Sequence, residues 1–103
     1  MGKQEEVDIF MNSFNLDIKP EYRLLDVVAE LGEVCNQVLS QTSYGEEDFL
    51  RSKHLEEEIG DLYFSLIALA NRLNIDLDLC LEKVMEKYEK RIKENGDPGS
   101  KRV

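Results

Sequence analysis

Two pairs of carboxylates stand out because the members of each pair are three residues apart in stretches with helical periodicity. Glu30 and Glu33 form the first pair, and Glu58 and Asp61 form the second. Residues three apart project from one face of a helix. Both pairs border apolar stripes, so the four side chains could converge between two antiparallel helices. A loop of a few residues after Gln41 favours that arrangement.

Four converging carboxylates repel one another unless a cation neutralises them. Their ligand atoms are all oxygens, with no His or Cys in either pair, and such a set favours Mg²⁺ or Mn²⁺ over zinc or copper. Proteins usually bind Mg²⁺ through a few carboxylates together with substrate phosphates. The pattern therefore predicts a magnesium site that handles phosphates. The alternative is that these carboxylates are solvated residues of a helix surface, where such pairs are common.

Candidate residues for substrate binding follow the second carboxylate pair. Lys83, Lys87 and Arg91 are four apart, so they form a line along one helix face. Facing the carboxylates, this line would bind the phosphates of a substrate. Asn71 and Arg72, at the end of the preceding helix, could contact substrate or cap that helix. The alternative for the cationic line is pairing with acidic residues of its own helix, namely Glu82, Glu86, Glu89 and Glu94.

Four helices are predicted to position these residues. A short helix covers residues 7–14, and a second begins at Pro20, which suits a first helical turn. A third is predicted to begin near residues 46–48, and a fourth after an N-cap at Asp76. Sustained β-type alternation is missing from the sequence. We therefore expect an all-α, four-helix-bundle-like single domain over residues 1–96, with a mobile C-terminal tail at residues 97–103.

The third predicted helix is apolar nearly all round from Leu62 to Ala70. A helix of this kind must be covered on several sides. Four helices of one short chain would leave part of it bare, so we expect a homo-oligomer, either a dimer or a tetramer. The alternative is a well-covered central helix in a monomer.

Composition excludes several classes of protein. The formal net charge of −9 argues against a protein that binds nucleic-acid phosphates, which needs a surplus of Lys and Arg. Cys35 and Cys80 are the two cysteines, and their spacing is typical of small core residues in a reduced protein. No apolar run approaches the roughly 18–20 residues that span a bilayer. We expect a cytoplasmic protein that binds neither nucleic acid nor membrane.

The carboxylate motifs also resemble those of a known family. Residues 28–34 (VAELGEV) followed by residues 57–64 (EEIGDLYF) are similar to the MazG-like all-α NTP pyrophosphohydrolases, whose signature is E-E-x-x-E, a spacer, then E-x-x-D. The resemblance covers roughly residues 20 to 95. It implies an Mg²⁺ cofactor, for which Mn²⁺ could substitute. The ligands would be Glu30, Glu33, Glu58 and Asp61. Ala29 stands where the family commonly has Glu, so one carboxylate of the first motif is absent.

The resemblance further implies hydrolysis of an NTP or dNTP between its α- and β-phosphates. The products would be the monophosphate and pyrophosphate, and the biological role would be removal of unwanted nucleotides. Glu33 and Glu58 are the expected catalytic residues, with Glu33 favoured as general base, and the cationic line would offset charge on the departing pyrophosphate. Two alternatives come from other classes. One is a non-catalytic helical oligomerisation or regulatory module, and the other is a di-metal redox bundle, which the missing His ligands disfavour.

Overall fold

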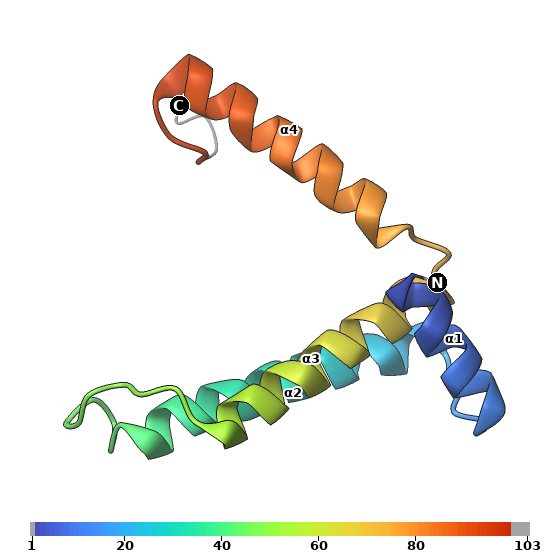
Figure 1. Ribbon diagram of the computed structural model, residues 1–103, viewed down its shortest axis with the longest axis horizontal. Coiled ribbons are helices and arrows are strands. Elements are labelled where there is room, and N and C mark those ends of the chain that lie inside the picture. Colours follow the sequence, from blue (N-terminus) through green and yellow to red (C-terminus); the bar gives the residue numbers. More distant parts are fainter. Residues whose placement is uncertain (1, 100–103) are drawn as a thin grey trace.

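The computed structural model describes residues 2–99, and all regular secondary structure in this range is helical (Figure 1). Residues 100–103 of the predicted tail lie outside the described part of the chain. The prediction of an all-α chain with one short and three longer helices is confirmed. The helices are α1 (Lys3–Ser13), α2 (Pro20–Gln41), α3 (Lys53–Arg72) and α4 (Leu77–Asn95).

Local sequence signals explain most of the helix ends. Pro20 occupies the first turn of α2, where its missing N–H costs nothing. The Asp76 side chain accepts a hydrogen bond from the backbone N–H of Leu79 at 3.1 Å and so caps α4, as predicted. Gly96 ends the same helix with a φ of 83°, a left-handed conformation that glycine adopts without steric cost.

The start of α3 was predicted too early. Instead of beginning near residues 46–48, the helix begins at Lys53. Residues 43–45 all have positive φ angles and turn the chain away from a helical path. The Ser52 hydroxyl then accepts a hydrogen bond from the backbone N–H of Leu55 at 3.1 Å, which defines a new helix start.

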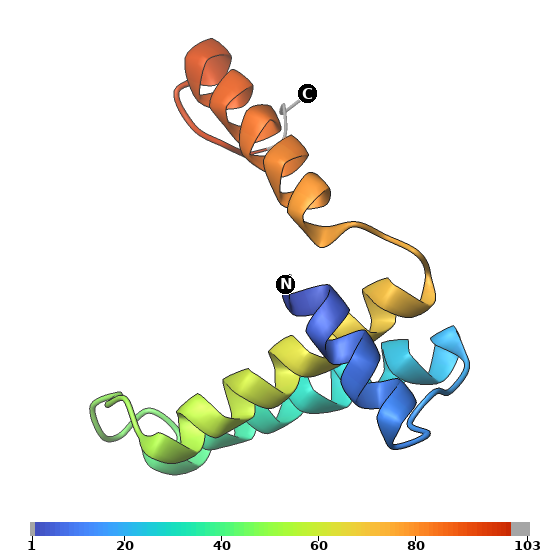
Figure 2. The same ribbon diagram turned by 45° about the vertical axis from the view of Figure 1, so that its right-hand side comes forward.

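Helices α2 and α3 lie side by side and antiparallel, and α1 crosses α3 near its C-terminal end (Figures 1 and 2). The buried side chains gather along α3, where Leu55 and Ile67 are 8% and 3% exposed. Met11 adds a buried side chain from α1. The Phe10 and Phe64 rings pack edge to face, with centroids 5.9 Å apart. Helix α3 is therefore the centre of the fold, as its apolar sequence indicates.

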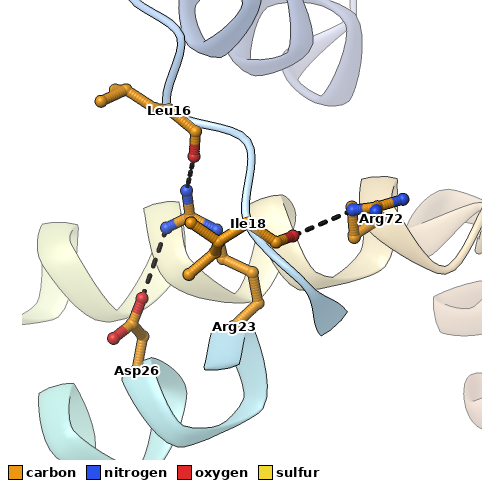
Figure 3. Close-up of polar contacts among 5 residues, drawn as sticks. All are labelled: Leu16, Ile18, Arg23, Asp26 and Arg72. Atoms are coloured by element: carbon orange, nitrogen blue, oxygen red, sulfur yellow. Dashed lines mark hydrogen bonds and ion pairs between the residues drawn. The ribbon is translucent and has the colours of Figure 1, made fainter. Parts of the chain in front are cut away.

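Two arginines hold the segment between α1 and α2 (Figure 3). Arg23 donates to the Leu16 carbonyl and, through Nη1, to Asp26 Oδ2 at 3.3 Å. Arg72, at the end of α3, donates from Nε to the Ile18 carbonyl at 2.9 Å. The linker is thus bound to both long helices, and this fixes where α2 begins beside α3.

Helix α4 stands apart from the other three. It leaves the end of α3 and points away from the α2·α3 pair in both views (Figures 1 and 2). Its apolar stripe is consequently bare in the described chain, with Leu81 57% and Tyr88 42% exposed. The apolar stripe of α2, which includes Leu24, Val28 and Leu31, is similarly bare, with Val28 61% exposed.

The two cysteines lie on these same uncovered helices. Cys35 on α2 and Cys80 on α4 are both exposed, so their prediction as core residues is wrong for the single chain. The helical spacing did place them beside apolar stripes. No other helix of the described chain covers those stripes, and the thiols therefore meet solvent.

Candidate metal centre

Three of the four predicted ligands meet between α2 and α3. Glu30, Glu58 and Asp61 each offer one carboxylate oxygen, and these three oxygens lie within 4.8 Å of one another. The antiparallel packing of α2 on α3 brings together the two motifs at residues 28–34 and 57–64. Oxygens on opposite sides of an Mg²⁺ ion are about 4.2 Å apart, because Mg–O distances are about 2.1 Å. Small side-chain adjustments would therefore fit the three carboxylates around one ion.

The electrostatics of the cluster favour a cation. The pKa of the Glu30 carboxyl is raised, first by its partial burial and then by the negative charges of Asp61, Glu58, Glu33 and Asp26, in that order. Each of these effects disfavours the ionised form of Glu30. A divalent cation among these groups would reverse the repulsion, so the donor set and its charge fit a hard metal ion.

Glu33 lies outside the group of three. It follows Glu30 by three residues on α2, and its side chain is exposed. Its charge nevertheless contributes to the raised pKa of Glu30. Ala29, also exposed, adds no carboxylate at the position where the MazG-like signature has Glu.

Asp26 joins this acidic face from the preceding turn of α2. It lies four residues before Glu30 and is partly buried, and Arg23 binds its carboxylate. The sequence interpretation gave Arg23 no role, although its i,i+3 spacing from Asp26 is typical of an ion pair on a helix.

The cationic line on α4 does not lie beside the carboxylates in the described chain, because α4 points away from α2 and α3 (Figure 2). The Lys87 ammonium sits 5.2 Å from the centroid of the Tyr88 ring. Arg91 donates from Nη1 to the Pro98 carbonyl at 3.2 Å. Lys83 shares the same detached helix. The phosphate-binding role of these three residues stays a prediction.

Asn71 lies at the junction of helices rather than beside the acidic cluster. Its side-chain amide exchanges hydrogen bonds with Gln4 of α1, at 3.0 Å to the Gln4 side chain and 2.9 Å to the Gln4 carbonyl. The sequence interpretation did not single out Gln4, since a lone glutamine near the start of a helix carries no spacing signal.

Fold and site together define an all-α protein with a carboxylate-only candidate cation site between two antiparallel helices. Residues 19–95 match the MazG nucleotide pyrophosphohydrolase domain. The chain therefore belongs to the MazG family and is a nucleotide pyrophosphohydrolase, as the two carboxylate motifs indicated. Hydrolases of this family generally use a divalent metal ion.

Similarity to a known protein and its crystal structure supports this family assignment. The chain is 36% identical over 95 residues to the uncharacterized protein YpjD of Bacillus subtilis, covering 88% of this chain and 84% of that protein. The crystal structure of YpjD from Bacillus subtilis superposes with a TM-score of 0.69 at 37% identity and covers 85% of this chain and 90% of that one.

A shorter match connects the chain with a nucleoside triphosphate pyrophosphohydrolase of Escherichia coli K12. The two are 45% identical over 40 residues, which is 39% of this chain but 15% of the larger protein. None of the helices within residues 2–99 combines the length and apolarity needed to cross a membrane.

Proposed function

We propose that this protein hydrolyses a nucleoside or deoxynucleoside triphosphate between its α- and β-phosphates, releasing the monophosphate and pyrophosphate. The observation that carries the proposal is the meeting of Glu30, Glu58 and Asp61 oxygens within 4.8 Å of one another. Membership of the MazG family supports the class of bond that is cleaved. The name of the E. coli relative supports a triphosphate as the substrate.

Mg²⁺ is the proposed cofactor, held by Glu30, Glu58 and Asp61, with Glu33 completing the acidic set. Hard carboxylate oxygens suit Mg²⁺, and Mn²⁺ accepts the same ligands. When bound, the ion supplies charge neutralisation and polarisation of a phosphate oxygen. By holding the ion, the three carboxylates would also orient the triphosphate, whose charge the ion would neutralise.

Glu33 is the proposed general base. Its side chain is exposed and lies outside the three-oxygen group, so its carboxylate keeps free lone pairs for a water molecule. The water oxygen bonds to the α-phosphorus as the bond to the bridging oxygen breaks, and Glu33 takes the proton. Glu58 is the second proposed catalytic residue, because it would hold the ion that neutralises the charge of the triphosphate.

Lys83, Lys87 and Arg91 are proposed to offset the charge of the departing pyrophosphate. Their helix carries a bare apolar stripe, and so does α2, where Leu25 and Val28 are each 61% exposed. Exposed apolar surfaces of this extent mark interaction sites. We therefore propose a homo-oligomer, a dimer or a tetramer, whose assembly packs α4 against an α2·α3 pair and brings the cations to the carboxylates.

A coupled pyrophosphate-release assay tests the reaction. Ordinary and modified NTPs and dNTPs are supplied with Mg²⁺, Mn²⁺ or EDTA to the natural protein and to Glu58→Gln and Asp61→Asn. We expect metal-dependent release of monophosphate and pyrophosphate, lost in both variants and kept in Glu57→Gln, which changes an exposed neighbouring carboxylate.

The same assay can refute the proposed reaction. If no substrate yields monophosphate and the thermal stability does not respond to Mg²⁺, the enzyme proposal fails and a non-catalytic helical module remains. Activity with modified nucleotides above that with ordinary ones would support a role in clearing unwanted nucleotides from the cytoplasmic pool.

A further inference from the structure

The side chain of Gln4 joins three helices at one point. Its Nε2 donates to Asn71 Oδ1 at 3.0 Å and to the Ile75 carbonyl at 2.7 Å. Its Oε1 accepts a hydrogen bond from the backbone N–H of Leu77 at 2.8 Å. Asn71 Nδ2 in turn donates to the backbone carbonyl of Gln4 at 2.9 Å. Both donors and one acceptor site of a single amide thus tie α1 to the end of α3 and the start of α4.

These contacts act on the short connection from which α4 departs. Asn74 has a φ of 55°, so the chain turns sharply after α3. Leu77 contributes one of the backbone N–H groups that a helix leaves unpaired at its N-terminus. Gln4 satisfies this N–H, while the Asp76 carboxylate satisfies that of Leu79. The first turn of α4 is therefore held from α1 as well as from its own cap.

Little else in the described chain holds α4 at its present angle. The space between α3 and the first turns of α4 is an open groove of about 640 Å³, with Tyr63, Leu66 and Leu81 among its lining residues. Because this groove is open, no packed side chains of the described chain oppose a movement of α4 toward α3. Within one chain, the angle between α3 and α4 consequently depends on the hydrogen bonds at the junction, which direct α4 toward the α2·α3 pair that receives it in the proposed assembly.

The geometry points to Gln4 and Asn71 as positioning residues that set the direction of α4. Because α4 carries Lys83, Lys87 and Arg91, the junction also decides where these cations lie relative to the carboxylates. The effect of Gln4 and Asn71 on the direction of α4 does not depend on the reaction. The effect of these two residues on substrate binding rests on the proposed phosphate-binding role of α4.

Loss of the Gln4 hydrogen bonds is expected to change KM more than kcat. Without the Gln4 hydrogen bonds, a smaller fraction of the molecules has α4 in the direction that packs against the α2·α3 pair and binds substrate. The apparent affinity for substrate falls in proportion to the competent fraction. Saturating substrate shifts the equilibrium back to the competent state, so the maximal rate is retained. We expect KM to rise about three- to tenfold, with kcat changed by less than about twofold.

A distance measurement tests whether Gln4 sets the direction of α4. Gln4→Met keeps the length of the side chain and removes its hydrogen bonds. Spin labels are attached to Cys35 on α2 and to a cysteine introduced by Glu94→Cys on α4, in a Cys80→Ser background, and labelled chains are diluted with unlabelled protein. We expect Gln4→Met to broaden the distance distribution.

A matched control lies on the same helix. Glu6→Gln breaks one exposed ion pair, Lys3–Glu6 at 3.1 Å, and is expected to leave the distribution narrow. An unchanged distribution in Gln4→Met would overturn the inference. Should that variant fail to fold, the same measurement on Asn71→Asp decides, because the substitution keeps the acceptor for Gln4 and loses the donor.

Kinetics separate this inference from the proposed function. Lys87→Ala should raise KM and lower kcat together, since it removes a contact to the departing pyrophosphate. If Lys87→Ala changes neither constant, the phosphate-binding proposal for α4 fails, and the label distances still test the junction. If Lys87→Ala raises KM and Gln4→Met does not, the role of the junction in substrate binding is refuted.

Discussion

Glu30 of α2 and Asp61 of α3 face each other across the antiparallel pair, with carboxylate oxygens within 4.8 Å. Among the surrounding charges, that of Asp61 acts most strongly on Glu30. The two residues are 31 positions apart in the numbering, and the packing of α2 on α3 alone brings them together. Their repulsion in the absence of a cation has consequences for stability as well as for metal binding.

Asp61→Asn is expected to stabilise the metal-free protein while abolishing its response to Mg²⁺. The substitution removes a negative charge that repels Glu30 and also removes a proposed metal ligand. In EDTA we expect the Tm to rise by a few degrees, since about 1 kcal/mol shifts the Tm of a domain of this size by about 4–8 °C. Thermal unfolding with EDTA and with Mg²⁺ measures both effects. A lower Tm in EDTA would show that the carboxylates do not repel one another significantly.

The metal-free protein should lose stability as the pH rises above the ordinary Glu value of 4.5. The pKa of Glu30 is higher in the folded than in the unfolded chain, so the folded state binds more protons in this range and stability falls with rising pH. Urea unfolding in EDTA across this range measures the slope, which should be smaller in Glu30→Gln. Identical slopes in the two proteins would contradict the raised pKa.

Val28→Lys is expected to dissociate the proposed homo-oligomer. Val28 is 61% exposed on the bare stripe of α2, and a lysine there would place a charge in the proposed interface. Sedimentation equilibrium should report a lower mass than for the natural protein. Glu82→Lys changes charge on α4 away from its apolar stripe and serves as the control. A natural protein that is monomeric at all concentrations would refute the interface.

Arg23→Ala is expected to lower the free energy of unfolding by about 1–3 kcal/mol, because it removes two hydrogen bonds that each contribute about 0.5–1.5 kcal/mol. The Arg23 side chain is 11% exposed, and it binds both Asp26 and the Leu16 carbonyl. Urea denaturation measures the change. Lys19→Ala, at an exposed position of the same linker, should leave stability within about 0.5 kcal/mol. Equal effects of the two substitutions would mean that Arg23 does not hold the linker.

Several features were predictable because they depend on neighbours in the sequence. The Pro20 start of α2, the Asp76 cap and the Gly96 end each involve a hydrogen bond or steric rule that operates over a few residues. The start of α3 was not predictable in the same way. Glu46 to Asp48 are compatible with a helix start, and the positive φ angles just before them redirect the chain.

The sequence by itself determined the helical class, the two carboxylate motifs and membership of the MazG family. These properties follow from residue spacing, which any helix converts into a shared face. The tertiary structure decided which groups actually meet. Antiparallel packing joined Glu58 and Asp61 to Glu30 and left Glu33 outside the three-oxygen group.

The tertiary structure also decided the position of α4. Helical spacing placed its lysines in a line but carried no information on the angle of the helix to its neighbours. That angle depends on contacts between residues far apart in the chain, such as Gln4 with Leu77. Spacing specifies a face within one helix, whereas the geometry of a site depends on how separate helices pack.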